Sequence, residues 1–266
     1  MSIRRFDARY GEPDLNASAK DSMSKVPEVT LVFWIIKIAA TTLGETAGDA
    51  VSMSMDLGYL AGTGIFAAIF AAAVSAQIWA KTFHPSLYWF TIIATTTVGT
   101  TLADFADRSL GIGYAGGSSL LFVLLMGSLF SWHRALGSVS VDTVSTPRAE
   151  VFYWVTIMLS QTLGTALGDW TADTEGLGYG AAAILFGSAL ALLAAACYWT
   201  RISRVLLFWA AFILTRPLGA VVGDFLDKPV TSGGLALSRY SASAALLAVM
   251  LACIFLFPQR AAKRAH

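Results

Sequence analysis

Five carboxylates stand inside long apolar stretches of this 266-residue chain, where an ionised side chain is energetically costly. They are Glu45, Asp49, Asp104, Asp169 and Asp224. Insertion scales assign about 2.5–3.5 kcal/mol to one aspartate at the centre of a membrane-spanning helix. Carboxylates in such a setting are typical of ion and proton pathways, so these five residues predict a site for a small cation or for protons.

A ribbon of polar side chains accompanies the first two carboxylates. Lys37, Thr41, Glu45 and Asp49 follow one another at intervals of four residues, so each is rotated by about 40° from the previous one on an α-helix. They share one helix face. This arrangement predicts a water-lined seam between packed helices.

The ribbon belongs to a pattern that occurs four times. Trp34, Trp89, Trp154 and Trp209 are separated by 55, 65 and 55 residues. Each tryptophan is followed by a small residue after ten positions, a second small residue after fourteen and an aspartate after fifteen. Fixed spacing of this kind is the signature of an internal repeat, and the longer middle interval predicts two halves of two repeats each.

The repeats assign equivalents to the polar ribbon. Thr96, Gln161 and Arg216 take the position of Thr41, and Thr100, Thr165 and Ala220 take that of Glu45. Lys37 and Arg216 are the only basic residues well inside the apolar stretches, so five ionised carboxylates predict an interior charge of −3. Like carboxylates held close together favour partial protonation until a cation arrives, which is the basis of proton-coupled exchange.

Oxygen ligands of this type suit a hard divalent cation such as Mn²⁺, Mg²⁺ or Ca²⁺. No cofactor is expected apart from such a transported ion, for which the predicted ligands are the five carboxylates. Two structural alternatives stay open: each aspartate ends its helix by accepting loop hydrogen bonds, or it pairs with Arg108, Lys228 or Arg239. Arg216 is expected to neutralise Asp224 or to bind a substrate anion.

The glycines of the repeat predict close helix packing, because two small residues four positions apart form a flat stripe that admits a neighbouring backbone. By themselves they imply no chemistry. The packing residues are Gly44, Gly48, Gly99, Gly164, Gly168, Gly219 and Gly223.

The elements that carry these residues are expected to span a membrane. Hydrophobic residues make up 56% of the chain and its mean hydropathy is +0.65, which is too apolar for an ordinary soluble domain. A spanning helix needs about 20 apolar residues. Eight runs approach that length, at residues 29–52, 60–80, 86–106, 114–132, 151–172, 178–199, 205–226 and 238–257.

The predicted fold is an all-α polytopic membrane protein with eight transmembrane helices from four two-helix repeats that face the same way. Its parts are a cytoplasmic polar tail (1–28), one transmembrane domain (29–257) and a cytoplasmic basic tail (258–266). The repeats within the domain are 29–83, 84–133, 150–203 and 204–257. Thirteen basic residues on the side of the termini against three on the other predict that both termini are cytoplasmic.

The chain resembles a bacterial membrane-protein family built from four tandem two-helix repeats, each with a tryptophan and a Gly-x-x-x-Gly-Asp motif. The resemblance covers about residues 29–257 and implies the topology and the repeat number, whereas it implies no substrate. The segment ETAGD at residues 45–49 is also similar to the Glu-x-Gly-Asp signature of calcium/manganese cation exchangers, although its spacing differs by one residue and only the first repeat has the glutamate.

The sequence thus predicts a secondary transporter or exchanger of a small cation in the bacterial inner membrane. A non-transporting membrane scaffold and a passive channel are the alternatives. An enzyme is not expected, because no nucleophile–base pair stands out, and a net charge of +1 gives no reason to expect nucleic acid. The expected partners are the lipid bilayer, a small inorganic ion and, as an open alternative, further copies of the chain in a homo-oligomer.

Overall fold

The computed structural model describes residues 24–174 and 176–262 as an all-helical protein. Predictions about residues 1–23 and 263–266, which include most of both tails, lie outside the described residues. The described part contains eight long α-helices, and each coincides with one of the predicted apolar runs. They are α2 (Leu31–Asp49), α3 (Gly58–Trp79), α4 (Pro85–Asp104), α5 (Tyr114–Leu136), α6 (Pro147–Asp169), α7 (Gly178–Trp199), α8 (Arg204–Asp227) and α9 (Arg239–Leu256).

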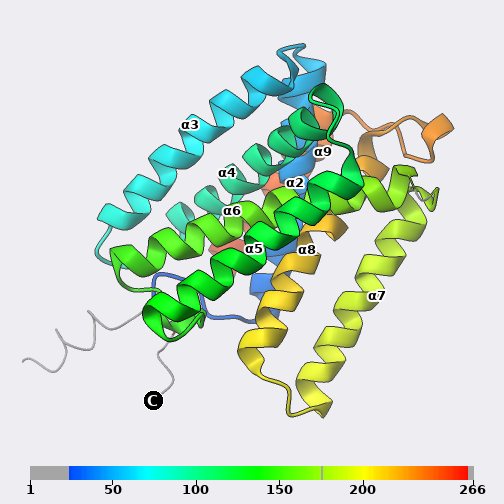
Figure 1. Cartoon of the computed structure of the whole chain (residues 1–266). Coiled ribbons are helices and arrows are strands. Elements are labelled where there is room, and N and C mark those ends of the chain that lie inside the picture. The colour runs from blue at the N-terminus through cyan, green and yellow to red at the C-terminus, as the bar shows by residue number, and fades with distance from the viewer. Residues whose placement is uncertain (1–23, 175, 263–266) are drawn as a thin grey trace, which may run out of the picture.

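The first helices of the four repeats form a closed ring. In this ring α2 packs on α4, α4 on α6, α6 on α8, and α8 again on α2. The second helix of each repeat lies outside and packs on the ring helix of the next repeat: α3 on α4, α5 on α6, α7 on α8, and α9 back on α2. Figure 1 shows α3 and α7 on opposite outer sides of the bundle. We call α2, α4, α6 and α8 the inner helices and the other four the outer helices.

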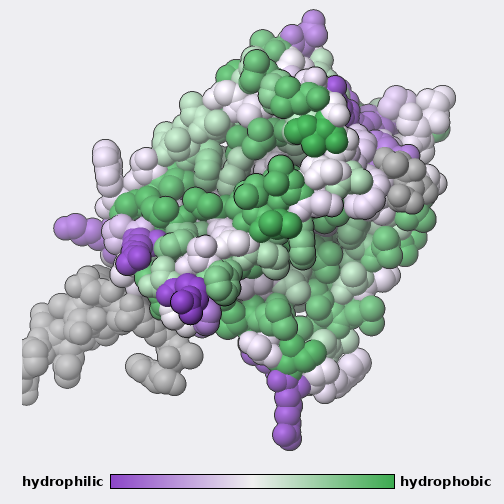
Figure 2. Space-filling model, viewed as in Figure 1, coloured by the Kyte–Doolittle hydropathy of each residue, from purple (hydrophilic) through white to green (hydrophobic). Residues whose placement is uncertain are grey.

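Burial separates the two sets of helices. Thirteen of the 19 residues of α2 are buried, against three of the 22 residues of α3. The outer helices expose large apolar side chains such as Leu60, Phe122, Leu192 and Phe255. Figure 2 shows hydrophobic residues across the middle of the visible face and hydrophilic residues gathered toward its ends. Such a continuous apolar surface suits contact with lipid.

Six of the helices in the described part are long and apolar enough to cross a membrane, namely α3, α5, α7, α8, α9 and α2 together with the turn that follows it. The two helices outside this set are α4 and α6. Their mean hydropathy is lowered by polar residues that are buried in the ring, among them Thr96, Thr100, Gln161 and Thr165.

Three inner helices end in the same way, directly after the aspartate of the repeat. A π-helical turn follows Asp49, Asp104 and Asp169, at Ala50–Ser54, Phe105–Ser109 and Trp170–Thr174. Each turn leads to a glycine with positive φ, namely Gly58, Gly113 and Gly178, and glycine adopts that conformation without steric cost. This explains the Gly-Tyr pair that three repeats share. The fourth repeat lacks the pair, and α8 continues as an α-helix to Asp227.

The tryptophan end of the ring is closed. Phe33, Tyr88, Tyr153 and Phe208 belong to one buried aromatic cluster, in which the hydroxyls of Tyr88 and Tyr153 are 2.6 Å apart. The two described chain ends meet over this end of the ring, because Pro27 and Ala261 form an antiparallel β-bridge. A buried ion pair of 2.6 Å between Lys25 and Glu150 fixes the N-terminal segment to α6.

Candidate functional site

The repeat glycines set the register of the inner ring. A Cβ atom on Gly44 would overlap Thr96 of the next inner helix, one on Gly99 would crowd Gln161, one on Gly164 would overlap Arg216, and one on Gly219 would overlap Thr41. Each glycine therefore leaves room for the side chain seven residues after the tryptophan of the neighbouring repeat. We call these four side chains the seam residues (Thr41, Thr96, Gln161 and Arg216), and all four are completely buried.

The second small residue of each motif lies one helical turn further along the same helix interface and contacts the neighbouring inner helix there. Gly48 lies against Thr100, Gly168 against Ala220 and Gly223 against Glu45. These three partners and Thr165 occupy the position eleven residues after each tryptophan, and we call them the axial residues. Glu45 is therefore the only axial residue with a charge, so a fourfold sequence repeat carries a single acidic group at this level.

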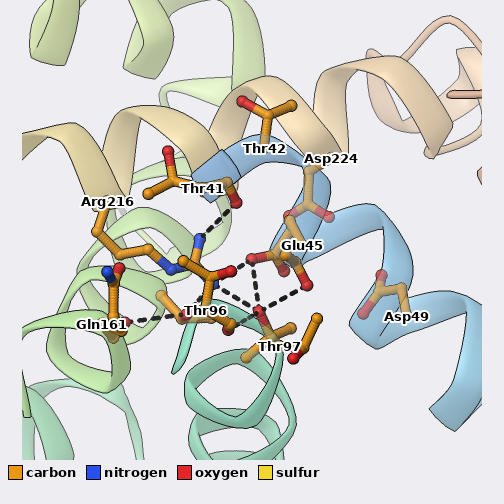
Figure 3. Close-up of polar contacts among 12 residues, drawn as sticks. Thr41, Thr42, Glu45, Asp49, Thr96, Thr97, Gln161, Arg216 and Asp224 are labelled. Carbon is orange, nitrogen blue, oxygen red and sulfur yellow. Dashed lines mark hydrogen bonds and ion pairs between the residues drawn. The ribbon is translucent and has the colours of Figure 1, made fainter. Parts of the chain in front are cut away.

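Arg216 reaches from its seam to that acidic group. Its Nη2 atom donates to Glu45 Oε2 at 2.8 Å and to the hydroxyls of Thr100 and Thr165 at 2.5 Å each. One guanidinium thus connects the axial residues of three other inner helices, and its side chain is fully buried. The expectation that Arg216 neutralises Asp224 is wrong for this structure, because the side chain extends toward Glu45 (Figure 3).

The four aspartates that end the inner helices lie at one end of the ring, and each is at least 98% buried. Arg108 joins two of them: its Nε atom is 2.9 Å from Asp104 Oδ1, and its Nη2 atom is 3.4 Å from Asp169 Oδ2. Lys228 joins the other two, with Nζ 3.2 Å from Asp49 Oδ2 and 3.1 Å from Asp224 Oδ1. The four aspartates therefore pair with basic residues, as the structural alternative predicted, and they also lie together around one axis.

Arg239 adds a weaker contact, 3.6 Å from Asp49, while its Nε atom holds Asp227 at 2.6 Å. The two bridging cations change the expected charge balance. With Arg108 and Lys228 added to Lys37 and Arg216, the five carboxylates face four basic side chains, so the fully ionised set would carry a charge of −1 and not −3. Arg108 and Lys228 were predicted to lie in loops, so the predicted interior charge of −3 did not include them.

Lys228 remains a cation in this environment. Burial by itself lowers the pKa of its ammonium group, but the carboxylates of Asp224 and Asp49 outweigh burial and raise the pKa above its ordinary value. Lys228 is the residue that follows the last turn of α8. The ammonium is therefore a permanent positive charge on a flexible stem, placed between two helix-end aspartates.

Three of the five predicted carboxylates form a compact group. Ligand oxygens of Glu45, Asp49 and Asp224 all lie within 4.8 Å of one another, and all three residues are buried. Asp49 Oδ1 has no hydrogen-bond partner within the part of the chain that the structure describes. Figure 3 shows Glu45 between the Arg216 side chain and Asp224. We call these residues the carboxylate triad; Asp104 and Asp169 are not members of it.

The remaining predicted site residues lie apart from the triad. Thr41 donates its hydroxyl to the carbonyls of Ile38 and Thr215, so it seals the α2–α8 seam. The Gln161 side-chain amide has no partner among the described residues. Lys37 Nζ also has none, and it lies 4.1 Å above the centroid of the Phe212 ring. Lys37 thus places a buried amino group over an aromatic ring, one helical turn closer than Thr41 to the tryptophan end.

Arg108 and Lys228 were predicted as pairing partners of the aspartates but were not included in the predicted cation site. A signal for them exists: Arg108 and Lys228 each follow a repeat aspartate by four residues, at Asp104 and Asp224. Residues four apart on a helix lie on the same face. Repeats one and three carry Met53 and Asp173 at that position instead. Cation-bearing and cation-free repeats therefore alternate around the ring.

The comparisons with known proteins support the repeat and say nothing of a substrate. A family model described as Repeat of Unknown Function (DUF347) matches four consecutive segments, at residues 32–83, 87–137, 152–203 and 207–262. No curated protein and no solved structure matches the chain. The four matched segments cover most of its length, so the chain belongs to this family of four tandem repeats of unknown function.

Proposed function

We propose that the chain is a secondary transporter that exchanges a small cation, a divalent metal such as manganese, against protons. The single observation that carries this proposal is the carboxylate triad, in which Glu45, Asp49 and Asp224 bring buried oxygens from α2 and α8 within 4.8 Å of one another. Carboxylate oxygens are the ligands that hard divalent cations prefer. A buried carboxylate cluster also binds protons when no metal is present.

Two tethered cations already occupy the neighbourhood of the triad. Arg216 binds Glu45, and Lys228 lies between Asp49 and Asp224. A metal ion that binds all three carboxylates has to replace these contacts. The hydroxyls of Thr100 and Thr165 accept hydrogen bonds from Arg216 independently of Glu45, so the guanidinium keeps two partners when Glu45 turns toward a metal. In this mechanism Arg216 and Lys228 act as built-in counter-ions of the metal-free state.

The proposed membrane arrangement has eight spans. Helices α4 and α6 contain 20 and 23 residues, enough to cross a hydrocarbon core of about 30 Å, and their buried polar residues face other inner helices. We infer that the four repeats are parallel, with their symmetry axis along the membrane normal. Both termini then lie in the cytoplasm of a bacterium, and the helix-end aspartates lie near the outer face of the inner membrane.

A second candidate function follows from the ion pairs themselves. All four helix-end aspartates have a cationic neighbour within 3.4 Å. This favours a membrane scaffold in which the charges lock the helix ends and no ion moves. The two candidates predict different effects of the same substitutions.

The test is manganese uptake into proteoliposomes driven by a pH gradient. Asp49→Asn and Asp224→Asn are expected to abolish uptake, because each removes one ligand of the triad, while the purified proteins keep the wild-type elution volume. Asp56→Asn is the matched control: Asp56 is exposed and has φ 55°, a conformation that asparagine tolerates, so uptake is expected to continue. Absence of uptake by the wild-type protein for every divalent cation tried would favour the scaffold. Uptake that ignores the pH gradient would indicate a passive channel.

A further inference from the structure

An apolar groove lies away from the carboxylate triad. It has a volume of about 640 Å³ and lies between α2, α7 and α8, with the loop at residues 140–142 at one end. Its walls are formed by apolar side chains, among them Trp34, Ile38, Leu190, Leu193 and Phe208. Its volume is within the range of about 300–1,000 Å³ that is typical of small-molecule sites.

The groove lies where the outer helix α7 stands beside α2 without packing closely on it. The outer helix α3 packs on α4 and also touches α6, the inner helix after α4. The equivalent outer helix α7 packs on α8 but stands away from α2. In Figure 1, α7 diverges from the rest of the bundle. The space between α7 and α2 is therefore open, and it lies beside the exposed apolar surface of α7.

One end of the groove is polar and contains both an arginine and an aspartate. Thr30, Ser140 and Arg204 contribute to the lining there, with Asp142 as the acidic residue of this end. Arg204 and Arg201 are both exposed, and one terminal nitrogen of Arg204 donates to the carbonyl of Cys197. The groove thus joins an apolar trough to Arg204 at the tryptophan end of the bundle, and the exposed Arg201 stands three residues earlier in the chain.

We propose that this groove binds a phospholipid with an anionic headgroup. One acyl chain lies along α2 and α7 over the surface of α8, and the phosphate lies beside Arg204 and Arg201. The apolar lining selects an acyl chain, and the arginines favour a negative headgroup, because a basic residue near the membrane surface attracts anionic lipid. The inference does not depend on the proposed transport. Since Thr215 lines the groove and its carbonyl accepts a hydrogen bond from Thr41, the lipid contacts the α2–α8 seam directly.

The test is lipid binding by the full-length protein in detergent, measured by native mass spectrometry with phosphatidylglycerol and phosphatidylcholine. Ala194→Trp places an indole in the groove, and Ala194 is exposed there. It is expected to remove the tightly bound phospholipid. Ala68→Trp on the exposed face of α3 is the matched control and is expected to retain it. Arg201→Gln with Arg204→Gln is expected to reduce the preference for phosphatidylglycerol by about 25-fold, or about fivefold for each arginine.

Three outcomes would overturn the inference. The first is equal phospholipid retention by Ala194→Trp and Ala68→Trp, which would place the bound lipid elsewhere. The second is a wild-type protein that binds phosphatidylcholine as well as phosphatidylglycerol, which would remove the role of the arginines. The third is dissociation of an oligomer by Ala194→Trp alone, which would show that a second copy of the chain covers the groove. A wild-type protein that binds phosphatidylglycerol as expected but transports no metal would contradict only the proposed function.

Discussion

At the scale of single residues, the site is asymmetric although its framework is repeated four times. The seam position holds two threonines, a glutamine and Arg216, and the axial position holds Glu45, two threonines and an alanine. One arginine and one glutamate therefore form a single buried ion pair near the centre of the ring. A buried pair contributes little net stability, whereas removing one partner leaves an uncompensated charge. The pair is thus better explained as part of a site than as a stabilising device.

The first prediction concerns this pair. Arg216→Gln copies Gln161 of repeat three, and Glu45→Thr copies Thr100 of repeat two, so both new residues already occur at equivalent positions. Each single substitution is expected to destabilise the protein by about 3–5 kcal/mol, because it strands a buried charge. The destabilisation of the double variant is expected to be smaller than the sum of the two single destabilisations by about 0.5–3 kcal/mol. Thermal unfolding of the four proteins in detergent measures this coupling, and strictly additive losses would show that the two charges do not interact.

The second prediction concerns Lys228. Lys228→Gln removes the cation between Asp49 and Asp224, so Mn²⁺ is expected to stabilise this variant at about tenfold lower concentration than the wild type, since a unit charge about 4 Å away contributes about 1–4 kcal/mol. The measurement is the melting temperature as a function of Mn²⁺ concentration, which reports binding by linkage.

Arg108→Gln is the control for Lys228→Gln. It removes the bridging cation of Asp104 and Asp169, which lie outside the carboxylate triad. Its Mn²⁺ response is expected to match that of the wild type. An equal increase in Mn²⁺ affinity in both variants would show that the metal binds to the aspartates in general and not to the triad.

At the scale of helices, the repeated motif packs the inner helices and places the carboxylates of the candidate site. The first glycine of each motif admits a seam residue from a neighbouring inner helix. The aspartate directly after the second small residue ends the α-helix or leads into its last turn. Close approach of the inner helices in this way excludes lipid from their polar faces. The outer helices carry the exposed apolar surface instead, and only three residues of α3 and three of α7 are buried.

The third prediction separates packing glycines from the others. Gly219→Ala is expected to destabilise the protein by about 1–3 kcal/mol, because the new methyl group overlaps Thr41. Gly187→Ala in α7 meets no atom within 4 Å and is expected to be neutral or to stabilise by up to about 1 kcal/mol through helix propensity. The two changes are chemically identical, so melting temperatures that fall equally in both would argue against the packing register of α2 and α8.

At the scale of the whole molecule, the ring closes because the last repeat packs on the first. Helices α8 and α9 both contact α2, and the described chain ends meet in the bridge between Pro27 and Ala261. The second half of the chain copies the first, so repeat four corresponds to repeat two. Arg108 in repeat two and Lys228 in repeat four therefore occupy equivalent positions. A cation path between the inner helices requires this closure, because no single repeat brings the triad together.

The fourth prediction tests the proposed orientation. In a background with Cys197→Ser and Cys253→Ser, Thr231→Cys places a thiol near the helix-end aspartates, and Thr82→Cys places one at the tryptophan end; both threonines are exposed. A membrane-impermeant maleimide is expected to label Thr231→Cys in intact spheroplasts and Thr82→Cys only after permeabilisation, since basic loops stay in the cytoplasm. The reverse labelling pattern would invert the topology, and labelling of both from one side would contradict an odd number of spans between them.

Much of the architecture was predictable from the sequence because it depends on local and periodic properties. Apolar runs of about 20 residues located the eight helices, and the regular tryptophan, glycine and aspartate spacing identified four repeats. The positive φ of Gly58, Gly113 and Gly178 explains why three repeats share a glycine after the π-helical turn. The hydropathy of α4 and α6 is lowered by residues that only the ring buries.

The candidate site depended on distances that no repeat spacing contains. Periodicity places Glu45, Asp49 and Asp224 on particular helix faces, but it does not determine which helix faces are in contact. Only the closed ring brings α2 and α8 together, pairs Arg216 with Glu45 rather than with Asp224, and extends Lys228 back to two aspartates. The sequence alone determined the helices and their repetition, because these follow from hydropathy and local chain geometry. The tertiary structure alone decided the partners of each charge, because side chains far apart along the chain meet only when the first and last repeats pack together.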